Sequence, residues 1–480
     1  MPSEPTMTLL TKIISETTVY PTTKSTLPNL KLSTSDLPML SCHYIQKGNL
    51  FLQPPIPFSD LVHRLKQSLS TTLTHFPPLA GRLVTDSDGY VYITCNDLGA
   101  KFVHAEATHV MVNDVVSPLQ FPDVTETFFT LDRMVSYDGH SNPILAVQVT
   151  ELYDGVFIGF TVNHAVVDGT SLWHFINTFA EICKGMDLKQ KVPCFARDSV
   201  LSSPTVLKLP VGGPKVTFDE HAPMCERVFK FSRESILKLK QTINGNKSSC
   251  DGNEINVNAI EMMGKQRNDI PVNDAVTSLT DDGIRNAVVT KPEPEISSFQ
   301  SLCALLWRAV TRARKFENSK MTTFRLAVNC RHRLEPKLDP FYFGNAIQKI
   351  PTYATAGDVL SHDLKWCAEQ LNKNISAHDD TMIRRFVNNW EMDPKCFPLG
   401  NPEGTMIIMG SSPRFPMFDN DFGWGKPVAV RSGRANKFDG KISAFPGRDG
   451  GGSVDLELGF SPETMAELEV DFEFMQYVSG

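Results

Sequence analysis

The stretch 160-FTVNHAVVDGTSLWHF-175 sets the frame for reading the rest of the chain. An apolar run ends in His164, Asp168 follows four residues later, and Gly169 and Thr170 open a segment with helical apolar spacing. The pattern predicts a buried strand, a short turn and a capped helix. The imidazole and the carboxylate would then lie at a strand end, where a rigid scaffold commonly holds functional groups.

The residues alone leave two interpretations of the His164–Asp168 pair open. A neutral histidine can accept a proton from a hydroxyl or an amine near pH 7, which is the task of a general base. The other interpretation is a hydrogen-bonded core histidine, with Asp168 capping the following helix. The chain has 12 histidines, so one such spacing is expected by chance, and spacing alone slightly favours the core histidine.

The composition bounds the class of protein. With 480 residues the chain is long enough for two domains, and 41% hydrophobic with 21% charged residues is typical of a globular fold. A net charge of -7 argues against a broad nucleic-acid surface but leaves room for a local basic pocket. No apolar run reaches 18 residues, so we expect no membrane span, only transient contact with a membrane surface.

Several kinds of chemistry lack sequence support. The ten cysteines form no C-x-x-C, and the histidines and cysteines lack metal-ligand spacing, so we expect no metal and reduced thiols. There is no P-loop, no G-x-S-x-G elbow and no dinucleotide fingerprint. The amino-terminal segment has no signal-peptide pattern, and the expected location is the cytosol.

The periodicity predicts an α/β protein with two mixed layers. We expect a domain over 1–190, a crossover over 191–223 and a second domain over 224–480, with a polar excursion at 244–294. The local patterns predict three further features: a helix over 57–76 capped by Ser59 or Asp60, a hairpin of 143–152 with 155–162, and one helix over 356–373.

Two blocks in opposite halves of the chain point to a known family. The segment 163-NHAVVDGTS-171 and the segment 421-DFGWG-425 resemble the two signatures of the plant BAHD acyltransferases, in the family's order and spacing. The resemblance implies two chloramphenicol-acetyltransferase-like domains, each a mixed β-sheet flanked by helices, with the active-site channel at their interface. It also implies a monomer that uses acyl-CoA as co-substrate, without a permanently bound cofactor.

The same resemblance assigns roles to single residues. His164 would be the general base, and Asp168 would pair with an arginine of "VNCRHR", Arg331 rather than Arg333, to orient the loop that carries His164. The remaining roles are a turn near CoA for Gly169 and Thr170, and structural positions for Asp421, Gly423, Trp424 and Gly425.

One segment departs from the family pattern. Many relatives carry Thr-Ser-Trp where this chain has Gly410, Ser411 and Ser412. The small residues predict a wider, less aromatic acceptor pocket, in which a serine hydroxyl would replace the missing threonine. A simple loop change without consequence for the substrate is the other interpretation, and the sequence does not decide between them.

The resemblance also bears on the substrate. Further segments, such as 431-RSGRANKFDGKISAFPGR-448, are similar to a family member that builds the plant cuticle. This implies an O-acyltransferase of cutin synthesis that moves a long-chain hydroxyacyl group from CoA to an aliphatic or glycerolipid hydroxyl. The alternatives are transfer to a phenolic or other small alcohol, a non-catalytic acyl-CoA-binding protein, and a lyase on the same fold.

Overall fold

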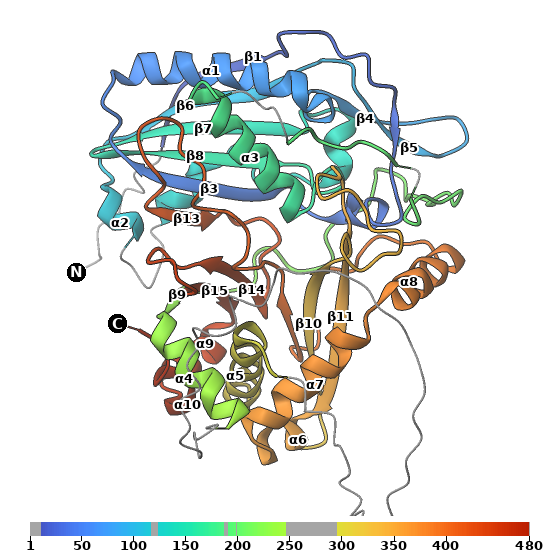
Figure 1. The fold of residues 1–480 in the computed structure, drawn as a ribbon, viewed down its shortest axis with the longest axis vertical. Helices are drawn as coiled ribbons and strands as arrows, with labels where there is room; N and C mark the ends of the chain where they lie inside the picture. Colours follow the sequence, from blue (N-terminus) through green and yellow to red (C-terminus); the bar gives the residue numbers. More distant parts are fainter. Residues whose placement is uncertain (1–10, 117–122, 187–190, 198, 246–294, 480) are drawn as a thin grey trace, which may run out of the picture.

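Two large sheets organise the chain. The structure is a computed structural model that describes residues 11–116, 123–186, 191–197, 199–245 and 295–479. Among these residues there are two six-stranded sheets, one above the other, and a small three-stranded sheet (Figure 1). The predicted polar excursion 244–294 lies, from residue 246 onward, outside the described residues.

The first sheet has the strand order β1-β6-β7-β8-β3-β13. It is mixed, because β6 and β7 run parallel whereas all other neighbours are antiparallel. Strands β7 and β8 form the predicted hairpin, and every residue of β8 is buried, as expected for a strand covered on both faces. The bounds are β1 Lys12–Val19, β3 Ile45–Leu52, β6 Ala100–Ala107, β7 Leu145–Leu152, β8 Gly155–Val162 and β13 Ala429–Ser432.

Strand β13 crosses from one half of the chain to the other. It belongs to the carboxy-terminal half by sequence, yet it pairs with β3 at the edge of the first sheet (Figure 1). The division into 1–190 and 224–480 stays a prediction, with one strand of the second segment built into the sheet of the first.

The second sheet has the order β11-β10-β12-β14-β15-β9 and is also mixed. Side chains alternate between its faces. One face packs on helices through residues such as Leu326, Ile407, Ile442 and Leu456, which belong to one buried hydrophobic cluster. The bounds are β9 Cys225–Phe231, β10 Met321–Asn329, β11 Ile347–Thr355, β12 Met406–Met409, β14 Lys441–Pro446 and β15 Val454–Phe460.

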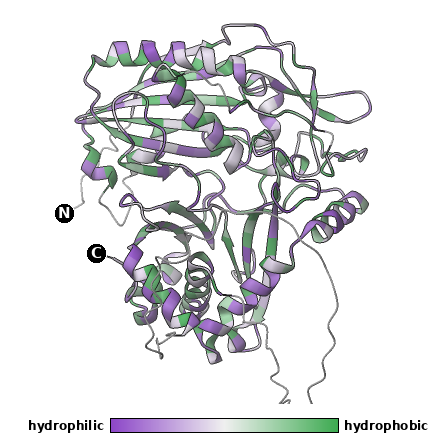
Figure 2. Cartoon of the chain, viewed as in Figure 1, coloured by the Kyte–Doolittle hydropathy of each residue, from purple (hydrophilic) through white to green (hydrophobic). Residues whose placement is uncertain are grey.

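Helices cover the outer faces of the sheets. In Figure 2 the central strands β7 and β8 of the first sheet are largely hydrophobic, whereas α1 alternates hydrophobic and hydrophilic residues, as an amphipathic surface helix does. The helices are α1 Phe58–His75, α2 Val112–Val116, α3 Gly169–Cys183, α4 Arg233–Asn244, α5 Ser298–Ala313, α6 Ala356–Ser361, α7 Leu364–Ala377, α8 Asp380–Met392, α9 Pro462–Glu469 and α10 Phe472–Met475. The small sheet contains β2 Leu30–Lys31, β4 Arg82–Thr85 and β5 Val91–Thr94.

Two local predictions were wrong. Neither Ser59 nor Asp60 caps α1, because Pro57 takes the N-cap position with an extended backbone, and no side-chain cap bond forms. The single helix over 356–373 is two helices, because the carboxylate of Asp363 accepts a hydrogen bond from the backbone N–H of Trp366 and starts a new helix.

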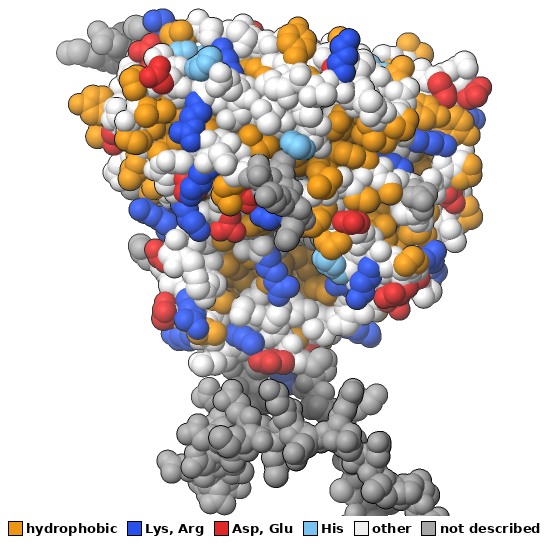
Figure 3. All heavy atoms as spheres, turned by 45° about the horizontal axis from the view of Figure 1, so that its top comes forward, with side chains coloured by type: hydrophobic (Ala, Val, Ile, Leu, Met, Phe, Trp, Pro, Cys, Tyr) orange, Lys and Arg blue, Asp and Glu red, His pale blue; other side chains and the backbone are white. Residues whose placement is uncertain are grey.

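The described surface carries side chains of every type. The face in Figure 3 intersperses acidic, basic and hydrophobic side chains. None of the helices within the described ranges has the length and apolarity needed to cross a membrane. The nine cysteines that the structure describes are all free thiols, as predicted.

Candidate active site

A cavity of about 800 Å³ lies between the two sheets. The first sheet and its helix α3 contribute Lys47, His164 and Trp173 to its lining, and the second sheet contributes Lys349 and Lys441. The channel implied by the family resemblance is therefore present, and the strand end of β8 delivers His164 to it.

The His164 imidazole is neutral and is held in one tautomer. Its backbone N–H donates to the hydroxyl of Ser136 at 3.1 Å, and Asn345 donates to its carbonyl oxygen at 2.8 Å. Its Nδ1 lies 3.1 Å from the carbonyl oxygen of Val167, an acceptor, so Nδ1 carries the proton and Nε2 keeps a free lone pair. Burial lowers the pKa of His164 to about 4, and the Lys349 and Lys441 charges act in the same direction.

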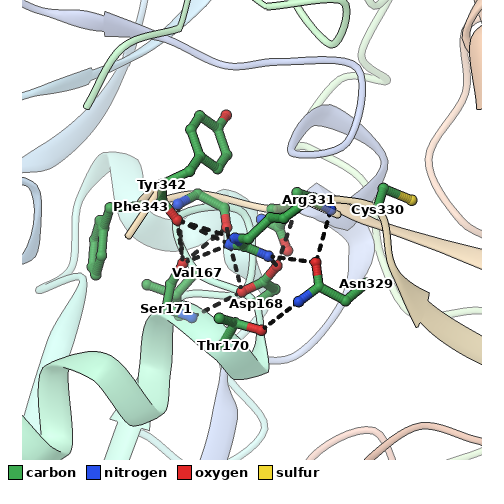
Figure 4. A network of polar contacts seen from close by, with 12 residues as sticks. Val167, Asp168, Thr170, Ser171, Asn329, Cys330, Arg331, Tyr342 and Phe343 are labelled. Atoms are coloured by element: carbon green, nitrogen blue, oxygen red, sulfur yellow. Dashed lines mark hydrogen bonds and ion pairs between the residues drawn. The ribbon is translucent and has the colours of Figure 1, made fainter. Parts of the chain in front are cut away.

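Asp168 pairs with Arg331 (Figure 4). The two side chains form a bidentate ion pair with N···O distances of 2.6 and 3.1 Å, and both are 0% exposed. Burial alone would raise the pKa of Asp168, but the charge of Arg331 and its hydrogen bonds lower it. The prediction of Arg331 over Arg333 is confirmed, since Arg333 donates instead to backbone carbonyls of the α7 end.

The pair joins segments that are distant in the sequence. Asp168 also accepts from the N–H groups of Ser171 and Ala346, so it caps α3 as well as binding Arg331. Arg331 donates further to the carbonyl oxygens of Tyr342 and Gly344 at 3.0 and 2.9 Å (Figure 4). Both interpretations of Asp168 from the sequence thus hold for its geometry, and the His164 loop is tied to the second half of the chain.

Gly169 and Thr170 open helix α3 and line the cavity. A Cβ on Gly169 would lie 2.7 Å from the ring of Phe415, so the glycine is needed for close packing of that ring. The Thr170 hydroxyl accepts a hydrogen bond from the Asn329 amide at 3.3 Å. Contact of these residues with CoA stays a prediction.

The 421–425 segment lies apart from the cavity. The Asp421 carboxylate accepts from the N–H groups of Gly423 and Gly425 and pairs with Lys184 at 2.6 Å. Both glycines have positive φ, at 110° and 118°, which this tight loop requires. The ring of Trp424 packs against Phe422 and Phe51, and none of these residues lines the cavity. The geometry supports the structural role predicted for Asp421, Gly423, Trp424 and Gly425.

The small residues 410–412 line the cavity as predicted, but the space beside Gly410 is filled. A Cβ on Gly410 would lie 2.1 Å from Nζ of Lys441. Ser411 and Ser412 are also in the lining, and the Ser412 hydroxyl accepts from the N–H of Arg414 at 3.2 Å. At Gly410 the missing side chain therefore makes room for an ammonium group rather than for an apolar substrate.

Sequence reasoning missed the lysines of this cavity. Lys47, Lys349 and Lys441 lie on β3, β11 and β14, strands that look like ordinary buried segments in the sequence. Burial lowers the pKa of Lys441 to about 7, and the nearby charges of Lys349 and Lys47 add to the effect. The available signal was a lysine within a short apolar strand, as in 441-KISAF-445.

The geometry places a neutral histidine, with Nε2 free, in a cavity between two mixed sheets. Comparison with known proteins gives the class. A family model described as Transferase family matches residues 9–475, so the chain belongs to this family, that of the BAHD acyltransferases. It is an acyl-CoA-dependent acyltransferase with acyl-CoA as its co-substrate.

Particular relatives are plant enzymes. BAHD acyltransferase DCR of Arabidopsis thaliana is 33% identical, over 97% of this chain and 92% of that protein. An uncharacterized acetyltransferase of Arabidopsis thaliana is 32% identical, over 93% of this chain and 94% of that protein. The shikimate O-hydroxycinnamoyltransferase of Nicotiana tabacum is 28% identical, over 84% of this chain and 86% of that protein.

Solved structures confirm the predicted two-domain α/β fold. Vinorine synthase matches with a TM-score of 0.72 and 20% identity, over 98% of both chains. Fusarium graminearum TRI101, solved with coenzyme A and deoxynivalenol, matches with a TM-score of 0.71 and 18% identity, over 94% of this chain and 99% of that one.

Proposed function

We propose that the enzyme transfers a long-chain hydroxyacyl group from CoA to an aliphatic or glycerolipid hydroxyl during plant cutin synthesis, with His164 as general base. Nε2 of His164 removes the hydroxyl proton as the oxygen attacks the thioester carbonyl. The tetrahedral intermediate collapses, the C–S bond breaks, and the imidazolium returns its proton to the leaving thiolate. The free enzyme is then restored, with CoA and an ester as products.

The state of His164 carries this proposal. A base must be neutral before it can accept a proton, and a pKa of about 4 keeps the imidazole neutral at cellular pH. The hydrogen bond from Nδ1–H to the Val167 carbonyl presents Nε2 as the free nitrogen. Asp168 is occupied by Arg331, so it positions the loop and does not polarise the ring.

Homology and cavity shape support the substrate class. DCR is a relative at 33% identity, and segments of this chain resemble a cuticle-building family member. The cavity of about 800 Å³ has apolar residues such as Leu172, Ile347 and Ile408 in its lining, which suits an aliphatic chain. We place the enzyme in the cytosol as a monomer that meets lipid substrates transiently at membrane surfaces.

The hydroxycinnamoyltransferase relatives support a second candidate function. Transfer to a phenolic or other small alcohol would use the same base and the same cavity, and the tobacco relative is 28% identical. A non-catalytic acyl-CoA-binding protein or a lyase agrees less well with a histidine that is held neutral with one nitrogen free.

Thiol release from purified protein tests the proposal. We would supply 16-hydroxypalmitoyl-CoA or coumaroyl-CoA, with glycerol, diacylglycerol, a hydroxy fatty acid or a phenolic alcohol as acceptor. We expect acceptor-dependent release from the hydroxyacyl donor, reduced about 100-fold or more in His164→Ala. His63→Ala, on the exposed face of α1, is the matched control and should keep the full rate.

Three results would contradict the proposal. A His164→Ala enzyme with full activity would reject the general base. Release only with coumaroyl-CoA and the phenolic alcohol would keep the base but move the enzyme to the second candidate. Tight binding of acyl-CoA without turnover on any acceptor would indicate the binding protein.

A further inference from the structure

One face of the second sheet is charged although it lies inside the protein. The residues that point toward the helices are apolar, whereas the alternate residues Lys349, Lys441 and Glu457 line the cavity. Lys47 and Ser432, paired across β3 and β13, face the same space from the first sheet. The two sheets therefore meet over a charged lining, in the part of the cavity that holds His164.

The lysines of this lining differ in whether a carboxylate neutralises them. Lys437 is neutralised by Glu226 and by Glu457, the latter at 3.2 Å. Among the described residues, no carboxylate lies within ion-pair distance of Lys349 or Lys441. Nζ of Lys349 lies 4.1 Å from the centre of the Phe397 ring, an aromatic contact that stabilises a cation without neutralising it. Lys47 also lacks an ion pair among the described residues, and Glu457 acts on Lys47 and Lys441 from beyond ion-pair distance. The cavity thus holds three lysines without an ion-paired carboxylate, of which Lys349 and Lys441 belong to the second sheet.

The backbone leaves space for Lys441. Nζ of Lys441 occupies the space beside Gly410, where any side chain would collide with it. Burying an unpaired charge is costly, and a fold retains such a group where a ligand supplies the opposite charge. Both lysines act electrostatically on His164, so the ligand charge would lie near the reacting atoms.

We propose that Lys441 and Lys349 form an anion subsite beside His164 that binds the carboxylate of a compact hydroxy-acid acceptor while His164 deprotonates its hydroxyl. This inference rests on the proposed acyl transfer and narrows its acceptor. It excludes a neutral alcohol such as glycerol as the preferred partner. The two lysines position the acceptor and take no part in bond making.

The position of the lysines favours the acceptor over CoA as the source of the anion. In acyl-CoA the long pantetheine arm separates the thioester from the phosphates, so phosphates cannot reach the lysines while the thioester is at His164. A carboxylate on the acyl group itself, as in malonyl-CoA, would share the same chemistry. The experiment therefore needs one arm for each source.

The test compares matched acceptors. Hydroxy acids with increasing separation of the two groups, from 4-hydroxybutyrate through 6-hydroxyhexanoate to 16-hydroxypalmitate, are each assayed beside their methyl esters with palmitoyl-CoA as donor. We expect kcat/KM to favour the acid over its ester by roughly tenfold or more, most strongly for the short members, because a hydrogen bond to a charged group is lost in the ester. Lys441→Met and Lys349→Met should each bring this ratio close to one.

Controls separate the possible failures. Lys320→Met changes a surface lysine that pairs with Glu403 at 3.6 Å and should leave rate and ratio unchanged. Circular dichroism and thermal unfolding show whether the cavity variants fold. No acceptor-dependent release with any compound, from palmitoyl-CoA or from 16-hydroxypalmitoyl-CoA, would reject the proposed function itself. Release with equal rates for acids and esters, or a ratio unchanged in Lys441→Met, would overturn the anion subsite alone.

A second set of assays tests the acyl donor. It replaces palmitoyl-CoA with malonyl-CoA or with the compound in which the free carboxylate of malonyl-CoA is a methyl ester, and it uses the neutral esters as acceptors. We expect no lysine-dependent preference between these donors. A preference for malonyl-CoA that disappears in Lys441→Met would overturn the assignment to the acceptor and move the anion to the acyl group.

Discussion

Two sets of charged side chains are buried where the sheets meet, and they are built in opposite ways. Asp168 and Arg331 satisfy one another through two N···O contacts and use their remaining groups on backbone partners. Lys441 and Lys349 face a cavity in which no carboxylate of the described residues lies within ion-pair distance of them. A satisfied pair holds the fold together, whereas an unsatisfied pair destabilises it and is retained for a ligand.

Breaking the satisfied pair should have the largest effect. Arg331→Met leaves Asp168 buried without its partner, and we expect a loss of roughly 3–5 kcal/mol in the free energy of unfolding. Denaturant unfolding measures it. Arg333→Met, two residues away, removes only bonds to backbone carbonyls and should cost about 1 kcal/mol. In Asp168→Asn with Arg331→Met the buried charge is gone, and part of the loss should return.

Replacing an unsatisfied lysine should act in the opposite direction. Lys441→Met removes a buried charge and should raise the free energy of unfolding by roughly 1–4 kcal/mol near neutral pH. The same change at Lys437 leaves Glu226 and Glu457 unpaired and should destabilise the protein. A lower melting temperature for Lys441→Met would mean that the lysine has a partner in the free enzyme.

The gain from Lys441→Met should depend on pH. The pKa of Lys441 is about 7 in the fold against 10.5 in an exposed lysine. Protonation is therefore unfavourable in the folded state, so the penalty is complete below about pH 7 and disappears as the pH rises past 10.5. Unfolding curves at pH 7 and pH 10 should show a larger advantage of the variant at pH 7.

The two sets of charged residues also differ in how far the sequence predicts them. His164, Asp168 and the arginine segment lie in contiguous blocks, so their roles follow from local pattern and family resemblance. Lys349 and Lys441 sit on β11 and β14, which meet only through the order β11-β10-β12-β14. Local alternation predicts that each is in a strand, but pairing of distant strands decides which face turns toward the cavity.

The same limit accounts for the interpretation of residues 410–412. Small residues in a loop predict empty space if nothing else is known of the surroundings. The neighbour that fills the space beside Gly410 comes from another strand, and its ammonium changes the expected pocket from apolar to basic. The predictions of helix boundaries were wrong for a more local reason, because Pro57 and Asp363 each set a helix start against the periodic pattern.

A smaller effect should follow from filling the space that Lys441 uses. In Gly410→Ala the new methyl group would lie 2.1 Å from Nζ, so the lysine head must move, at a cost of about 1 kcal/mol or less. The preference for acids over esters should fall severalfold. The double variant with Lys441→Met tests the origin, because the alanine should then have no effect on stability.

The smallest expected effect is on the acid limb of the pH–rate profile. His164 must be neutral to act, and the Lys441 charge helps to hold its pKa low, at about 4. Lys441→Met should therefore raise that pKa and move the acid limb of kcat/KM for an ester acceptor to higher pH, by on the order of half a unit.

A carboxylate bound beside the lysines in the wild-type enzyme should also raise the pKa of His164. With a hydroxy-acid acceptor, the acid limb of kcat should then lie at higher pH than the acid limb of kcat measured with its methyl ester, since only the complex with the acid contains the anion. Coincident limbs would place the carboxylate away from His164, even if the lysines still bind it.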